Sequence, residues 1–89
     1  MAGEDTLAQV AALLRATFQR PDIGIGAETT ADDVPGWDSL THGLVLMAIE
    51  RDFHIRFTPA EMLMVENIET LTVGDLARAV DARLAAGRP

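Results

Sequence analysis

One segment constrains the fold more than any other: residues 39–53 have helical spacing, with apolar side chains on two opposite sides. Each residue of an α-helix is rotated by about 100° from the one before it. The larger apolar set therefore lies on one side of this helix and consists of Val45, Leu46, Ile49 and Phe53. The opposite side gathers Leu40, Leu44 and Met47, with Gly43 at its edge. One side can face the core of a small bundle, so we predict that the Leu40 side is an exposed docking surface. The alternative is a central helix that its neighbours cover on both sides.

A first helix is predicted before this segment. Apolar residues recur there at helical spacing, namely Leu7, Val10, Ala11, Leu14 and Phe18. Thr6 followed by Gln9 fits a capping box at the start of this helix. Pro21, Gly24 and Gly26 then end the regular pattern.

A long loop over residues 19–38 joins the first helix to the second. Loops of this length in compact domains are functional or contain a short helical turn. We expect Ile23, Ile25 and Val34 to anchor the loop on the bundle. Its second half is acidic, through Glu28, Asp32, Asp33 and Asp38. These carboxylates lack the alternating spacing of a calcium loop, so we predict no metal site.

Two more helices are predicted after residue 53. Ile55 and Phe57 should turn inward as an extended link. Thr58, Pro59 and Glu61 then predict a capping box, with Pro59 at the first position of a short helix that covers residues 62–65. The last helix begins near Thr72, and Asp75 favours its N-terminus. Its apolar stripe consists of Val73, Leu76, Ala77, Val80 and Leu84. Gly87 fits the stop of this helix, and Arg83 and Arg88 suit its negative end.

These patterns predict an all-α fold: a single domain over residues 1–89, built as a small four-helix bundle with three longer helices and one short one. The 89 residues are 48% hydrophobic and 24% charged, a globular composition, and none is cysteine. Without a basic leader or a long apolar run, we expect a cytoplasmic protein. We also expect a monomer. All seven basic residues are arginine, which suggests a high-GC bacterial genome.

The net charge of −7 argues against binding to nucleic acid or to an anionic membrane surface. Both of these ligands are negatively charged and require basic side chains. If charge steers its partners, they should present Arg and Lys.

Ser39, in the stretch PGWDSLTHGL, is the candidate functional residue. It could be an ordinary first-turn residue behind an Asp38 cap, a nucleophile, or a point of attachment. Catalysis needs an oriented base, and His42 has no evident partner to orient it. His42 is expected to be partly buried in the helix, and His54 is expected at the surface. The WDSL stretch is similar to the motif of the GDSL hydrolases, but Trp37 replaces the glycine and their α/β scaffold would not fit in this chain.

Attachment of a phosphate group suits this position better. The amide groups and the dipole at a helix N-terminus favour the negative charge of a phosphate that is linked to Ser39. The Asp38 carboxylate would repel such a phosphate. An aspartate at this position is explained if a modifying enzyme recognises it. It is also explained if its carboxylate fixes the turn and helps to hold the metal-bound donor of the phosphate group during modification.

The chain resembles the acyl carrier protein family over most of its length. The family's Asp-Ser-Leu motif stands here as Asp38-Ser39-Leu40, at the start of the second helix. The stretch AIERDF resembles the end of the family's second helix, and IRFTPAE and IETLTVGDLARAV resemble its third and fourth helices.

The resemblance implies that a phosphopantetheinyl transferase uses coenzyme A and magnesium to attach a 4′-phosphopantetheine arm to Ser39. The arm would carry acyl groups as thioesters, and the protein itself would catalyse no reaction. Partners would be this transferase and acyl-loading, condensing or acyl-transfer enzymes with basic docking patches. Residues expected on the partner face are Trp37, Leu44, Met47, Glu50, Arg51, Met62 and Val65. Its two methionines can repack against different partners.

The sequence departs from the family in ways that bear on its pathway. Thr41 and Leu44 stand where carboxylates are common, and Arg51 interrupts an acidic run. Together with Trp37, these features favour polyketide, nonribosomal peptide or related specialised metabolism over fatty-acid synthesis. A docking module that is never modified is the second hypothesis, and a small serine hydrolase is a distant third.

Overall fold

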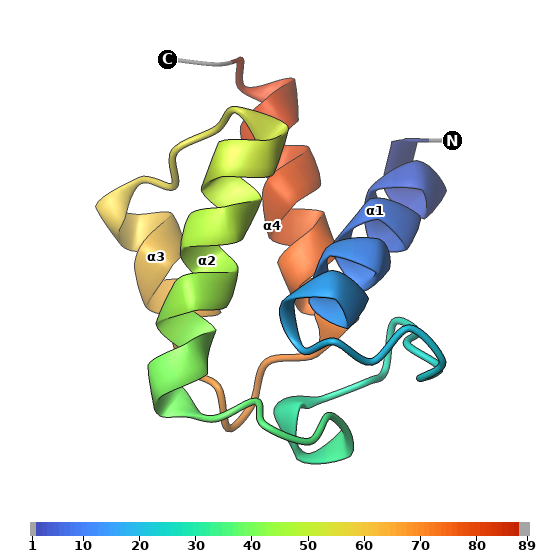
Figure 1. Ribbon diagram of the computed structural model, residues 1–89. Helices are drawn as coiled ribbons and strands as arrows, with labels where there is room; N and C mark the ends of the chain where they lie inside the picture. The colour runs from blue at the N-terminus through green and yellow to red at the C-terminus, as the bar shows by residue number, and fades with distance from the viewer. Residues whose placement is uncertain (1, 88–89) are drawn as a thin grey trace.

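The computed structural model describes the backbone of residues 2–87 and the side chains of residues 5–87. Over these residues the fold is all-α (Figure 1), with four α-helices: α1 (Ala2–Thr17), α2 (Ser39–Phe53), α3 (Pro59–Val65) and α4 (Val73–Ala85). One 3-10 turn, η1 (Ala31–Asp33), interrupts the long loop between α1 and α2. The predicted bundle of three longer helices and one short helix is therefore confirmed. Arg88 lies outside the described residues.

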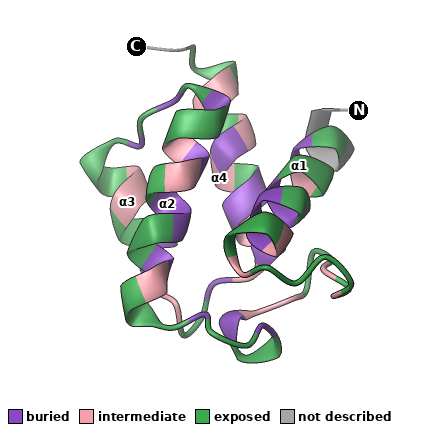
Figure 2. Ribbon diagram, viewed as in Figure 1, coloured by how far each residue is buried: buried purple, intermediate pink, exposed green. Residues whose placement is uncertain are grey.

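The core lies where the three longer helices face one another (Figure 2). Its fully buried side chains come from each of them and include Val10, Leu14, Val45, Ile49, Leu76 and Val80. α1 packs most extensively along α4. The Thr6 hydroxyl donates a hydrogen bond to Asp81 and so joins these two helices.

The predicted start of the first helix is wrong. α1 begins at Ala2, four residues before Thr6, so Thr6 is a buried residue inside the helix. The Thr6 and Gln9 pattern matched a capping box by residue type alone. Glu4 and Asp5 are residue types that the first turns of a helix favour, which is consistent with the earlier start.

The start and end signals of the other helices are confirmed. Thr58 and Glu61 form a reciprocal capping box at α3, and Thr72 and Asp75 form another at α4. α2 has the predicted bounds, and the backbone of Gly87 has the positive φ of a helix stop.

The long loop is tied to the bundle at several points. Val34 is buried, and Ile23 and Ile25 pack against the core, as expected. The Gly74 amide donates to the carbonyl of Ala27 over 2.8 Å, and a Cβ at Gly74 would lie 2.8 Å from that same oxygen. The loop therefore approaches the start of α4 so closely that only glycine fits there.

α2 has one buried and one exposed apolar side. Val45, Leu46, Ile49 and Phe53 are buried in the core. Leu40, Leu44 and Met47 remain 82%, 57% and 66% exposed. The alternative of a central helix covered on both sides is therefore excluded. Among the described residues, no helix combines the length and apolarity needed to cross a bilayer.

We predict that Phe53→Ala lowers the free energy of unfolding by about 3–5 kcal/mol, because it leaves a cavity in the core. Leu44→Ala is the matched control, since it removes an exposed side chain from the same helix and should change stability by less than about 0.5 kcal/mol. Urea unfolding measures both. Equal effects of the two substitutions on stability would contradict the assignment of one side of α2 as buried and the other as exposed.

Candidate functional site

Ser39 is the first residue of α2 and is exposed. Asp38 is the N-cap: its Oδ1 accepts a hydrogen bond from the Thr41 amide over 2.9 Å. Thr41 returns the bond, because its Oγ1 accepts from the Asp38 amide, also over 2.9 Å. Asp38 and Thr41 thus share the capping bonds, and Ser39 and Leu40 between them point to solvent.

The turn before Asp38 is also fixed by Thr41. The Thr41 hydroxyl donates to the carbonyl of Gly36 over 2.8 Å. Gly36 has φ of 91°, in the left-handed region that favours glycine. One threonine side chain therefore holds both the N-cap and the residue two positions before it.

The charge of Asp38 is stabilised by the same contacts. The hydrogen bond from the backbone amide of Thr41 is the main cause that holds the pKa of the Asp38 carboxyl below its ordinary value. Asp38 is therefore ionised at neutral pH beside the Ser39 hydroxyl. The unpaired amides of the first helical turn partly offset this negative charge.

Trp37 is buried, with only 6% of its surface exposed, so the expectation that it belongs to the partner face is wrong. Its ring packs against Phe18, and its Nε1 donates to His42 Nδ1 over 3.0 Å. Trp37 precedes the N-cap, and His42 is the fourth residue of α2. A large side chain just before the N-cap commonly packs against the fourth residue of the helix. Trp37 contacts His42 in this way, and this contact helps to bury the indole ring.

The partner face predicted on α3 is also in part wrong. Val65 is buried and Met62 is half-buried against the core, whereas Leu63 and Met64 are 70% and 74% exposed. Residues 62 and 65 are three positions apart and share one face of a helix, so both turn inward. The helical period could have identified Leu63 and Met64 as the exposed pair, because both lie away from the face that residues 62 and 65 share.

Glu50 and Arg51 are each engaged in a local contact. Glu50 is half-buried, and its Oε2 accepts from the Phe57 amide over 2.9 Å. Exposed Arg51 pairs with its neighbour Asp52 over 3.0 Å. The Glu50 carboxylate therefore fixes the link to α3.

His42 is not placed to act as a base for Ser39. It is buried, its Nδ1 faces Trp37 Nε1, and its Nε2 lies 2.8 Å from the carbonyl oxygen of Val65. Both ring nitrogens are thus engaged inside the domain. His54 is exposed at the end of α2, as expected. The part of the chain that the structure describes contains no group of three or more His, Cys, Asp or Glu residues that could hold a metal ion.

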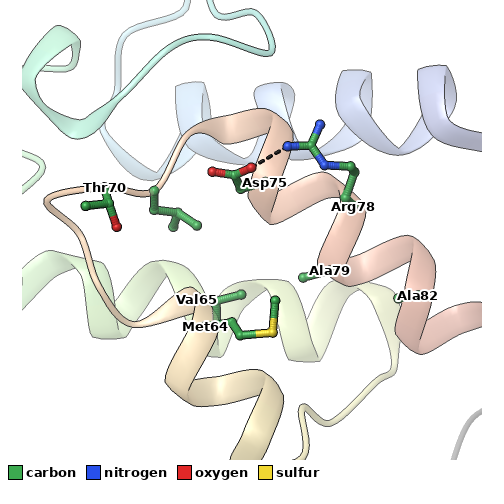
Figure 3. Close-up of a pocket in the computed structure, with 8 residues that line it drawn as sticks. Met64, Val65, Thr70, Asp75, Arg78, Ala79 and Ala82 are labelled. Atoms are coloured by element: carbon green, nitrogen blue, oxygen red, sulfur yellow. Dashed lines mark hydrogen bonds and ion pairs between the residues drawn. The ribbon is translucent and has the colours of Figure 1, made fainter.

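A groove of about 410 Å³ lies between α3, α4 and the loop that joins them (Figure 3). Met64, Val65 and Ala79 give it an apolar lining, and the Asp75–Arg78 ion pair lies at one side. None of the residues from Asp38 to Leu40 lines this groove. Ser39 is therefore presented on a surface outside this groove.

The fold and the site define a class of protein. An exposed serine opens a helix of a small bundle, and the histidine one turn further along is occupied by structural hydrogen bonds. This arrangement suits a carrier domain, which displays a side chain on its surface.

Comparison with known proteins identifies the family. The solution NMR structure of a holo acyl carrier protein from Geobacter metallireducens is similar to this chain, with a TM-score of 0.75 and 33% sequence identity. The match covers 91% of this chain and 87% of that one. No protein-family model and no curated protein sequence matches. At this identity and coverage, the chain belongs to the acyl carrier protein family.

The capping carboxylates generate a prediction for acid stability. Asp38, Glu61 and Asp75 each accept from a backbone amide at a helix start, and this lowers the pKa of all three below their ordinary values. A carboxylate with a lowered folded-state pKa stabilises the protein above about pH 5, and that contribution is lost as pH falls through the folded-state pKa. The free energy of unfolding should therefore fall on acidification.

Asp38→Asn tests the part due to Asp38. Asparagine caps a helix about as well as aspartate but does not titrate in this range. Urea unfolding at neutral pH and near pH 3 should show a smaller acid-induced loss of stability for the variant than for wild type. Equal losses would show that Asp38 contributes nothing to the pH dependence.

Proposed function

We propose that this carrier holds a 4′-phosphopantetheine arm on the Ser39 hydroxyl and presents acyl or aminoacyl intermediates to partner enzymes. The observation that carries the proposal is the exposed Ser39 at the first position of α2, within the Asp38-Ser39-Leu40 motif. When attached, the arm supplies a thiol on which acyl groups form thioesters. The chain itself has no cysteine, so no side-chain thiol competes with it.

The residues at the start of α2 fit such a group. The Ser39 side chain is open to solvent, and both neighbours of Ser39 are also exposed. The first-turn amides favour the negative charge of a phosphodiester. In the attachment step, the Ser39 Oγ–phosphorus bond forms and the bond from phosphorus to the 3′,5′-ADP part of coenzyme A breaks. The hydroxyl proton passes to a base of the transferase, because His42 is not available for this role.

Asp38 has two roles in this proposal. Its bonds with Thr41 hold the start of the helix, so that the neighbouring hydroxyl has a defined position. Its ionised carboxylate also offers a charge that can help the transferase to hold magnesium with the incoming coenzyme A.

The docking surface that we propose consists of Leu40, Leu44, Met47, Leu63 and Met64, the exposed large apolar residues of α2 and α3. Gly43 lies on the same helix, and a Cβ there would meet no atom within 4 Å. Packing within the domain therefore does not require glycine at this position, which leaves room for a partner to approach closely. The partners are the transferase and enzymes that load, condense or transfer acyl groups.

Charge and polarity of this surface bear on the pathway. Residues 39–49 of α2 include no Asp, Glu, Lys or Arg, so contacts there are apolar. The net charge of −7 still favours basic patches at the edges of a partner's docking site. We place the carrier in polyketide, nonribosomal peptide or related biosynthesis on the weak acidity of α2. The buried Trp37 no longer supports this placement.

Intact-mass measurement after incubation with coenzyme A and a broad-specificity phosphopantetheinyl transferase tests the attachment. Wild type should gain the mass of one arm, and Ser39→Ala should gain none. A wild-type protein that circular dichroism shows to be folded, but that stays unmodified, would favour the unmodified docking module instead.

Leu44→Asp and Met47→Asp test the docking surface. Each should weaken productive binding to a partner enzyme by about 1–2 kcal/mol, because a charge replaces an exposed apolar contact. Transfer kinetics measure the effect. Ala8→Asp is the matched control, since it places the same charge on an exposed position of α1. If the α2 variants unfold, or transfer no worse than the control, the surface is assigned wrongly.

A further inference from the structure

A chain of buried hydrogen bonds runs through His42, one turn after Ser39. Trp37 Nε1 donates to His42 Nδ1 over 3.0 Å, and His42 Nε2 lies 2.8 Å from the carbonyl oxygen of Val65. All three residues are buried, with 6% or less of their surface exposed. The ring of Phe18, just after α1, packs against the ring of Trp37 at a centroid distance of 5.8 Å.

The chemistry of the two neighbours defines the state of the imidazole. The indole nitrogen can only donate, so His42 Nδ1 must accept. The carbonyl oxygen of Val65 can only accept, so His42 Nε2 must carry the proton. One state of the ring meets both conditions, the neutral form with the proton on Nε2.

This ring joins the entry to α2 and the end of α3. Trp37 immediately precedes the Asp38 cap, so its anchoring fixes the path by which the chain enters α2. Val65 ends α3, and its carbonyl is one of those that a helix leaves without an internal partner. The imidazole therefore satisfies the end of α3 and holds the entry to α2 at the same time.

We propose that His42 is a positioning residue for the Ser39 site, a role that rests on the proposed attachment. Ser39 and both of its neighbours are exposed, so its orientation depends on the backbone on either side. Asp38 and Thr41 hold that backbone on the solvent side, and His42, through Trp37, holds it from within. When the bond to Trp37 is lost, the turn before Ser39 samples more conformations, and the transferase meets a correctly placed hydroxyl less often.

Three variants test this role, with kcat/KM of the transferase for each carrier as the readout. His42→Phe keeps a ring but removes both hydrogen bonds, and a displaced hydroxyl should lower kcat/KM about 10- to 100-fold. His42→Gln offers an amide acceptor and an amide donor at similar spacing, and it should retain most of the wild-type rate. Trp37→Phe removes only the indole donor and should also slow modification, which keeps the test valid if His42→Phe does not fold.

NMR spectroscopy shows whether each variant keeps the hydrogen bond to Trp37, so that a change in kcat/KM can be compared with its loss. Trp37 is the only tryptophan, so its Nε1–H signal is unambiguous. This signal should stay near its wild-type position in His42→Gln and shift in His42→Phe, and the ¹⁵N signals of His42 should show the proton on Nε2.

The outcomes separate this role from the attachment itself. If wild type is never modified, the proposed function fails, and with it any positioning role at that site. If wild type is modified, a folded His42→Phe with wild-type kcat/KM would overturn the positioning role alone. The positioning role would also be overturned if His42→Gln were modified as slowly as His42→Phe. A proton on Nδ1 of His42 would overturn it as well.

Discussion

The reciprocal hydrogen bonds between Asp38 and Thr41 hold the start of α2 on its solvent side, while Trp37 holds it from beneath through His42. Ser39 lies between these two supports and contributes to neither. A modification there leaves the bonds that begin the helix intact. A group attached there, as we propose, would leave the cap in place.

α2 divides its apolar residues between stability and recognition. The side with Ile49 and Phe53 belongs to the core, and the side with Leu44 and Met47 stays in solvent. None of the described helices covers that second side, and short α3 adds its own exposed residues, Leu63 and Met64. An enzyme that binds this surface would lie beside Ser39. The exposed side of α2 would then determine where a group attached to Ser39 meets that enzyme.

Sequence reasoning located most helix ends because they depend on local chemistry. The capping boxes of Thr58 and Thr72 act over three residues, and both are present as expected. The same reasoning failed at Thr6, since a pattern of two residues cannot exclude a helix that starts earlier. It also failed for Trp37 and Val65, whose burial depends on where α1 and α3 pack. The motif made Ser39 the candidate site, but the contacts of its neighbours could be seen only in the tertiary structure.

The central claim is that the Ser39 oxygen, and no other hydroxyl of this chain, bears the arm. Fragmentation mass spectrometry of residues 16–51, released from transferase-treated protein by trypsin, which leaves the Arg20–Pro21 bond uncut, tests it most directly. This peptide contains the only serine of the chain, together with threonines that include Thr41 two positions away. The account predicts fragments that place the whole added mass on Ser39. Added mass on Thr41 or on another threonine would contradict it.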